Sequence, residues 1–301
     1  MLQNMLPITL TPFHDDGSLD NASITRLTQF YLSHGAQGLV VLGIMGEAHA
    51  LLDQERESVI ARYVEAAQGQ VPVVATISAA ATEMAIERAR RAKALGAGAL
   101  MIAPPANVHD PSVLANHFER IAGATDLPWV LQDEPVTTGV RLTPAIIAEL
   151  AQKIPTLKAV KVEDVPTPSK IQQIHEGTPH LAIFGGLGGL YLFEELTHGA
   201  MGAMTGFSYP ELLARIITLF HTKKITEAQE LFYRYLPLIR YEAQLGVRGI
   251  AIRKLLYFQR ELIASPRVRT PAAPADAIIA QDLRDIVGSL GLPLGPAEST
   301  I

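Results

Sequence analysis

Short apolar runs and amphipathic stretches alternate along the chain with a period of about 25 to 30 residues, the spacing that repeated βα units require. The apolar runs are four to six residues long and are bounded by Gly or Pro, which is typical of buried parallel strands. Eight strands are predicted: Leu6–Thr11, Gly38–Leu42, Pro72–Ile77, Ala99–Ala103, Trp129–Gln132, Lys158–Val162, Leu181–Phe184 and Gly202–Thr205.

A helical pattern follows each predicted strand. Asp20 is suited to cap the first helix, and Asp110 and Thr143 each precede a Pro at the favoured first helical position. Helices are predicted at Asp20–Ser33, Asp53–Gln68, Thr82–Leu95, Asp110–Ala122, Thr143–Lys153, Ser169–His175, Leu190–His198 and Pro210–His221. This order predicts an α/β fold, a (β/α)8 TIM barrel. A doubly wound open sheet is the alternative, disfavoured because no strand leads into a convincing Gly-x-Gly-x-x-Gly turn.

Three more helical stretches continue beyond the eighth βα unit, at Ile225–Gln244, Gly249–Ala264 and Ala275–Leu290. Gly246 and a segment rich in Pro and Arg, Ser265–Pro274, separate them, and no low-complexity linker precedes them. We therefore expect a barrel over residues 1–224 and a C-terminal helical extension over residues 225–301, a bundle packed on the barrel within the same structural unit.

Lys161 ends the sixth predicted strand, and barrel active sites lie at the C-terminal ends of the strands. If Lys161 points into the barrel, the period of two along a strand puts three further side chains there: Leu157, Ala159 and Glu163. Enclosure disfavours the charged form of a lysine, and a neutral amine is the nucleophile that attacks a ketone. The alternative is a lysine at the rim that pairs with Glu163 or Asp164.

The segment that follows the second strand reads Gly-Ile-Met-Gly-Glu-Ala-His over residues 43–49. Amides flanked by glycines are suited to hold a carboxylate. The substrate-binding candidates in this segment are Gly43, Ile44, Met45, Gly46 and His49, and Glu47 is a catalytic candidate. The alternative is an ordinary loop, in which Glu47 caps a turn and His49 packs.

Three more strand ends carry candidate residues. Gln132 and Asp133 end the fifth strand and are suited to orient water or substrate hydroxyls; a capped turn before Pro135 is the alternative. Gly186 follows the seventh strand, where a glycine-rich stretch indicates close backbone packing more than a phosphate cradle, because no Lys or Arg follows closely. Thr205 ends the eighth strand. Gln132 is taken as catalytic, and Asp133, Glu163, Gly186 and Thr205 as substrate-binding.

The composition argues against several classes of binding partner. The net charge of the 301 residues is only −5, without a basic stripe, which argues against nucleic acid. The chain has no Cys, and its His pairs lack the spacing of zinc-binding helices, so no metal site is expected. The N-terminus does not read as a signal peptide, and no apolar run approaches the roughly 20 residues of a membrane span. A cytoplasmic protein without membrane attachment is expected.

Taken together and in order, these motifs resemble the dihydrodipicolinate synthase/N-acetylneuraminate lyase family. The matching segments are Pro-Ile-Thr-Leu-Thr-Pro-Phe at 7–13, Gly-x-x-Gly-Glu at 43–47, Ala-Pro-Pro at 103–105, Pro and Thr-Gly within 135–139, the lysine of strand six, and Gly-Ala-Met-Thr-Gly at 202–206. The resemblance implies that Lys161 is a Schiff-base lysine, that no cofactor is needed, and that the chain forms a homotetramer built as a dimer of dimers.

The departures from this family bear on the substrate. Ile44 and Met45 stand where the family usually has two threonines, Gln132 replaces the tyrosine of strand five, and Thr137 stands where the synthase has its carboxylate-binding arginine. Together with Leu-Pro-Leu-Ile at 236–239, the pattern is most similar to the 2-keto-3-deoxy sugar-acid dehydratases, especially the L-2-keto-3-deoxyarabonate type.

The functional hypothesis is therefore a Schiff-base lyase that acts on a small 2-oxo acid, with dehydration of a 2-keto-3-deoxy sugar acid favoured. A pyruvate-dependent aldolase and a hydrolytic deaminase use the same imine and remain alternatives. A catalytically silent barrel with a binding or regulatory role is the alternative from another class.

Overall fold

Eight parallel strands form a barrel in the computed structural model, which describes residues 2–243 and 248–295. The strands are β1 (Asn4–Pro7), β2 (Leu39–Val41), β3 (Val73–Thr76), β4 (Ala99–Ile102), β5 (Trp129–Asp133), β6 (Leu157–Val162), β7 (Ala182–Gly185) and β8 (Gly202–Thr205). Each strand pairs with its neighbour in sequence from β2 to β8, and β8 pairs with β1. A parallel bridge between Ile8 and Val40 links the β1 segment to β2. The predicted (β/α)8 TIM barrel is confirmed.

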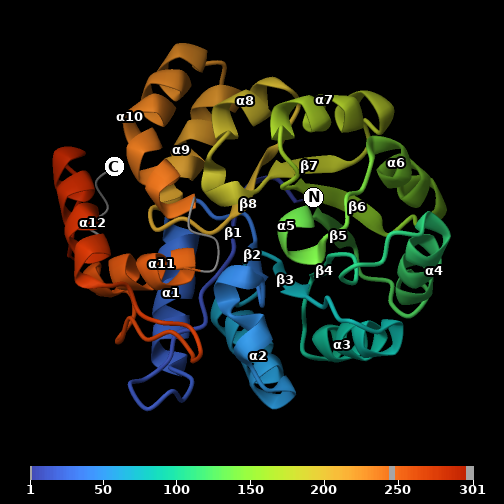
Figure 1. Ribbon diagram of the computed structural model, residues 1–301, viewed down its shortest axis with the longest axis horizontal. Helices are drawn as coiled ribbons and strands as arrows, with labels where there is room; N and C mark the ends of the chain where they lie inside the picture. Colours follow the sequence, from blue (N-terminus) through green and yellow to red (C-terminus); the bar gives the residue numbers. More distant parts are fainter. Residues whose placement is uncertain (1, 244–247, 296–301) are drawn as a thin grey trace.

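The helices surround the strands, as Figure 1 shows. They are α1 (Asn21–Ser33), α2 (Asp53–Ala67), α3 (Thr82–Ala94), α4 (Pro111–Ala122), α6 (Pro144–Lys153), α7 (Thr167–Gly177), α8 (Leu192–Thr197) and α9 (Pro210–His221). The expected caps are present, because the side chains of Asp20, Asp110 and Thr143 each accept a hydrogen bond from a backbone amide of the first turn. Local capping chemistry therefore sets where these three helices begin.

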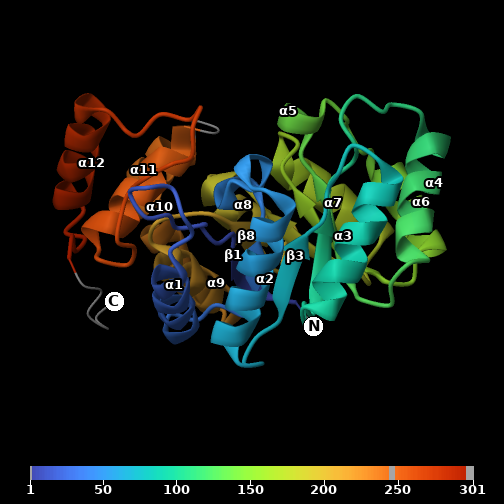
Figure 2. The ribbon, with the colours of Figure 1, turned by 90° about the horizontal axis from the view of Figure 1, so that it is seen from below.

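Four short elements at the C-terminal ends of the strands were not anticipated: the turns η1 (Ile44–Gly46), η2 (Ala48–Ala50) and η3 (Leu187–Gly189) and the helix α5 (Pro135–Thr138). Figure 2 shows α5 at the upper end of the barrel. Each element shapes the connection that leaves a strand, so the segments that carry the candidate chemistry are ordered turns rather than open loops.

The C-terminal helices α10 (Ile225–Ala243), α11 (Arg248–Gln259) and α12 (Ala277–Ser289) lie on one side of the barrel in Figures 1 and 2. Their apolar side chains share one buried cluster with α8 and α9. The α11 helix ends earlier than expected, because Glu261 adopts a left-handed φ of 56° and the Leu262 amide turns back to the Tyr257 carbonyl. The expected residues Gln244 and Gly246 lie outside the described residues.

Two apolar layers line the strands. Ala159 joins the interior cluster of the barrel, whereas Val160 and Val162 pack in the cluster between strands and helices, as predicted. The prediction for Leu157 is wrong, because Leu157 belongs to the outer cluster. The cause is a register shift between β5 and β6 that pairs Trp129 with Leu157 but Val130 with Ala159, which interrupts the alternation.

Across residues 2–243 and 248–295, no helix is both long enough and apolar enough to cross a bilayer.

Candidate active site

Three polar side chains meet inside the mouth of the barrel. Lys161 is only 5% exposed, and its Nζ lies 2.9 Å from Oε2 of Glu163. The same Oε2 accepts a hydrogen bond of 2.9 Å from Nε2 of Gln132. Lys161 is therefore enclosed by the barrel rather than placed at its rim, and it pairs with Glu163 as the rim alternative proposed.

The register of the sheet creates this group. Lys161 is the direct partner of Gln132 on β5 and of Phe184 on β7. Phe184 belongs to the interior apolar cluster, so all three side chains lie at one level of the barrel. Glu163 follows two residues after Lys161 and therefore points inward one layer higher. A lysine amine and a carboxylate are thus held together in a largely apolar enclosure.

Gly186 makes room for Glu163. A Cβ at Gly186 would lie 2.3 Å from Cγ of Glu163, so no larger residue fits there without moving the carboxylate. The next amide, of Leu187, donates to Oε1 of Glu163 over 3.3 Å, and the amide of Gly188 donates to Oγ1 of Thr205 over 2.8 Å. Close backbone packing is thus what these glycines provide, and Thr205 supports the turn that holds Glu163.

The strand-two segment, residues 43–49, closes over the barrel mouth from the opposite side. A Cβ at Gly43 would lie 2.7 Å from Cγ2 of Ile8, and Thr11 donates a 2.6 Å hydrogen bond to the Gly46 carbonyl. The Met45 side chain rests against Gly206, where a Cβ would lie 2.6 Å from its Cγ. The loop is therefore anchored at both ends, and Met45 reaches the rim that β8 forms.

Glu47 is directed away from Lys161. It adopts a left-handed φ of 52°, forms an ion pair with Lys254 on α11, and accepts a 2.8 Å hydrogen bond from the amide of Arg269. Burial lowers the pKa of Lys254 to about 8, although the charge of Glu47 opposes this shift. Through these contacts Glu47 fastens the strand-two segment to the C-terminal bundle. His49 is exposed on η2.

Asp133 lies on the helix side of β5. Its Oδ2 is 2.6 Å from Nζ of Lys170 on α7, and its Oδ1 accepts a hydrogen bond from the Leu142 amide. Burial raises the pKa of Asp133 above its usual value, while Lys170 acts in the opposite direction. The neighbouring Glu134 caps α5 by accepting from the Thr137 amide over 2.9 Å, as the capped-turn alternative proposes. The structure therefore brings Gln132 and Glu163 to Lys161, but not Asp133.

Sequence reasoning missed the contribution of the C-terminal bundle. Arg253 and Lys254, both buried on α11, reach the strand-two segment at Met45 and Glu47. The signal was present, because two adjacent cations interrupt the otherwise apolar stretch Ile-Ala-Ile-Arg-Lys-Leu-Leu. Charged residues are rarely buried without partners, so this pair indicated a contact to another part of the chain.

Another buried acid, Glu195, lies behind the site on the helix side of β7. Glu195 of α8 is fully buried, and its Oε1 accepts a 2.6 Å hydrogen bond from Oγ1 of Thr167. Gly185 is required beside it, since a Cβ there would lie 1.6 Å from Oε2. Burial raises the pKa of Glu195 to about 8, and the charge of Glu163 adds to the shift. Glu195 is therefore mainly protonated at neutral pH.

Replacing Glu195 by Gln should change how stability depends on pH. The pKa of Glu195 rises from the usual 4.5 to about 8 on folding, so the folded chain binds the proton more tightly. In the parent, the contribution of protonated Glu195 to the free energy of unfolding is fully present below about pH 4.5. This contribution is lost as pH rises toward 8. We expect Glu195→Gln to be close to the parent in stability at pH 5 and to exceed it by roughly 4 kcal/mol at pH 9. Urea unfolding across this range measures the difference, and parallel curves would contradict the assignment.

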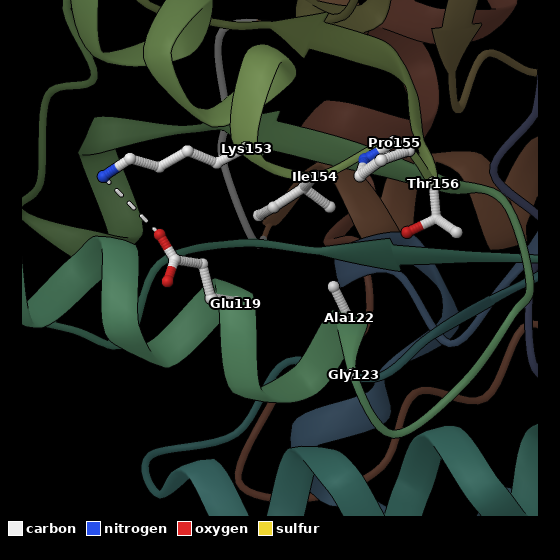
Figure 3. A pocket seen from close by; sticks show the side chains of 7 residues that line it. All are labelled: Glu119, Ala122, Gly123, Lys153, Ile154, Pro155 and Thr156. Carbon is white, nitrogen blue, oxygen red and sulfur yellow. Dashed lines mark ion pairs between the residues drawn. The ribbon is translucent and has the colours of Figure 1, made fainter.

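A surface pocket of about 630 Å³ lies at the other end of the barrel (Figure 3). Its lining includes Thr156, which precedes β6, and the ion pair of Lys153 with Glu119 at 3.6 Å. Lys161 stands at the opposite end of the same strand. Because barrel chemistry is carried by the C-terminal strand ends, this pocket is not the candidate site. No group of three or more His, Asp and Glu side chains suited to a metal ion occurs within the described part of the chain.

Comparison with known proteins shows the family to which the chain belongs. Residues 1–290 match the sequence profile of the Dihydrodipicolinate synthetase family. The chain is 30% identical over 275 residues to an L-2-keto-3-deoxyarabonate dehydratase of Azospirillum brasilense, covering 89% of this chain and 88% of that protein. It is 33% identical over 292 residues to a 4-hydroxy-tetrahydrodipicolinate synthase of Methanothrix thermoacetophila, covering 95% and 96%. The crystal structure of dihydrodipicolinate synthase from Rhodopseudomonas palustris superposes with a TM-score of 0.91 at 35% identity, covering 95% of this chain and 97% of that one.

Proposed function

The chain belongs to the dihydrodipicolinate synthetase family and is a lyase of that family, and from this premise we propose that Lys161 forms a Schiff base with the keto carbon of a small 2-oxo acid. The observation that carries the proposal is the contact of the enclosed Lys161 amine with Glu163, at 2.9 Å. A lysine at a barrel strand end, with an adjacent proton acceptor, is the arrangement that an amine nucleophile requires.

Glu163 handles the protons of imine formation. It takes one proton from the Lys161 ammonium, and the freed amine attacks the keto carbon of the substrate. The resulting carbinolamine loses its hydroxyl as water, with Glu163 returning the proton to the departing oxygen. Gln132 donates to Glu163 over 2.9 Å and so orients the carboxylate toward Lys161. A side-chain amide does not act as an acid or a base at neutral pH. Gln132 therefore positions the carboxylate, and Glu163 transfers the protons.

The protonated imine then withdraws electrons from the adjacent C3 carbon and makes its hydrogen acidic. Glu163, again a carboxylate once the carbinolamine has lost water, removes this proton and leaves an enamine. The enamine expels the hydroxyl on C4 of a 2-keto-3-deoxy sugar acid, which takes the proton back from Glu163 and departs as water. Hydrolysis of the remaining imine releases the dehydrated 2-oxo acid and restores Lys161. The substrate carboxylate docks against the amides of Ile44 and Met45 in the strand-two segment, between Gly43 and Gly46. Glu47 fastens this segment through Lys254.

Dehydration is favoured over aldol chemistry by two observations. The chain resembles an L-2-keto-3-deoxyarabonate dehydratase over most of its length. Gln132 occupies the β5 position beside Lys161, where the resemblance to the synthase would place a tyrosine. Aldol cleavage or condensation is the second candidate, since a 4-hydroxy-tetrahydrodipicolinate synthase is comparably similar. Family resemblance also supports a homotetramer that works without a cofactor.

Borohydride trapping tests the proposal. The protein is incubated separately with pyruvate and with a 2-keto-3-deoxypentonate, reduced, and examined by intact mass and peptide mapping. We expect a stable adduct on Lys161, formed more efficiently with the deoxypentonate. Turnover mixtures are then assayed with lactate dehydrogenase: a dehydratase yields no pyruvate from the deoxypentonate, whereas an aldolase does. Absence of an adduct across a wider panel of 2-oxo acids would reject the Schiff-base mechanism.

A further inference from the structure

Arg253 of α11 is buried, with 5% of its surface exposed, and only part of its guanidinium is paired within the bundle. Nε donates to Oε2 of Glu242 over 3.0 Å, and Nη2 donates to the Glu242 carbonyl over 3.3 Å. Glu242 is itself fully enclosed and also accepts from the Ser208 amide. One edge of the guanidinium is therefore neutralised inside the bundle.

The other edge reaches the strand-two segment. Among the described residues, the partner of Nη1 is the sulfur of Met45. A thioether is a weak acceptor, and Nη1 of an arginine carries two strong donors on a charged group. Within residues 2–243 and 248–295, this edge of the buried cation therefore meets a poor partner. Oxygen atoms of an anion would serve Nη1 better than Met45 does.

The guanidinium as a whole lies between the two segments that flank Lys161. Met45 belongs to the strand-two segment, which we propose to receive the substrate carboxylate. On the other side, Nη2 lies 3.2 Å from the position a Cβ would take on Gly188. The amide next to it, of Leu187, donates to Glu163 in the candidate site. The guanidinium thus stands at the rim, beside both the docking segment and the turn that holds Glu163.

The strand-two segment needs such a group. Ile44 and Met45 have no donor in their side chains, so at these two positions a carboxylate meets only backbone amides of the segment. A carboxylate leaving water for this enclosure loses hydration, which uncharged donors replace only in part. A charge-assisted hydrogen bond from an arginine is roughly twice as strong as a neutral one.

We propose that Arg253 binds the C1 carboxylate of the 2-oxo acid through Nη1, taking this role from the C-terminal bundle and thereby selecting 2-oxo acids over uncharged ketones. The unbranched side chain of Met45 moves aside when the carboxylate arrives, because methionine adapts its rotamer at low cost. This inference rests on the proposed function, since the carboxylate is that of the substrate of Lys161.

The test compares pyruvate with hydroxyacetone, in which a hydroxymethyl group replaces the carboxylate. Arg253→Met/Glu242→Gln removes both charges of the buried pair, so no uncompensated carboxylate stays in the core. We expect the efficiency of borohydride trapping with pyruvate to fall roughly 100-fold in the double variant, as for loss of a charge-assisted contact. Trapping with hydroxyacetone should stay within about twofold. Arg253→Lys should retain part of the preference, and Glu242→Gln alone should retain nearly all of it.

A purely structural role for Arg253 predicts a different result, since a displaced strand-two segment would lower trapping of both ketones equally. That outcome would overturn the proposal. Calorimetry of pyruvate binding to a Lys161→Ala variant separates the proposed role of Arg253 from the proposed function. Binding that depends on Arg253 without any imine would support the carboxylate role even if the Schiff-base mechanism failed, and binding indifferent to Arg253, or no binding at all, would overturn it.

Discussion

Replacement of Lys161 by Ala should lower kcat by a factor of roughly 10⁴ or more and should abolish the borohydride adduct. The reason is that covalent catalysis depends on one amine. Lys170 is held by Asp133 and Asp164 on the helix side of the sheet, and Lys254 is held by Glu47 beneath the strand-two segment. Neither side chain is placed to act in its stead.

Two further variants separate chemistry from folding. Lys161→Arg keeps a positive charge next to Glu163 but supplies no amine nucleophile, so we expect it to be folded and inactive. Lys158→Ala is the matched control, because Lys158 lies on the same strand, is exposed, and stands at the opposite end from the site. Its turnover should stay within about twofold of the parent. Steady-state kinetics, peptide mapping and melting temperature are the measurements, and turnover retained by Lys161→Ala would reject the mechanism.

Glu163→Gln should lower kcat by roughly 10²- to 10³-fold while leaving the fold intact. The amide fills the same space beside Gly186, and its single carbonyl oxygen keeps the hydrogen bond from either Gln132 or the Leu187 amide. It cannot take the proton of Lys161 or return one to the carbinolamine. The borohydride adduct should therefore still form on Lys161, but with a rate reduced in parallel with turnover.

Glu134→Gln is the control for this variant. Glu134 is also a buried acid near the site, but its carboxylate caps α5 through the Thr137 amide, a bond that the side-chain oxygen of Gln can preserve. We expect its kcat to change less than twofold, with at most a small loss of melting temperature. A Glu163→Gln enzyme with unchanged kcat would assign the proton transfers to another group.

The pattern of the chain was enough to place Lys161. The period of apolar runs predicts the barrel, the order of strands places Lys161 at the C-terminal end of the sixth, and the alternation of side chains points it inward beside Ala159. These features depend on interactions between residues close in sequence: helix caps, pleat and strand length. Local signals of this kind are legible in one sequence because they need no partner from elsewhere in the chain.

Partners that come from distant segments were decided only by the tertiary structure. Gln132 meets Glu163 because β5 and β6 pair in one register, and the register shift at Trp129 moves Leu157 to the outer layer. Glu47 is drawn to Lys254, more than 200 residues further along the chain. An acidic side chain at a strand end can form an ion pair with a cation on any of several neighbouring elements. The nearest buried cation determines which pair forms. The sequence by itself therefore determined the fold and the place of Lys161, the proposed nucleophile, and the folded chain selected which carboxylate contacts it.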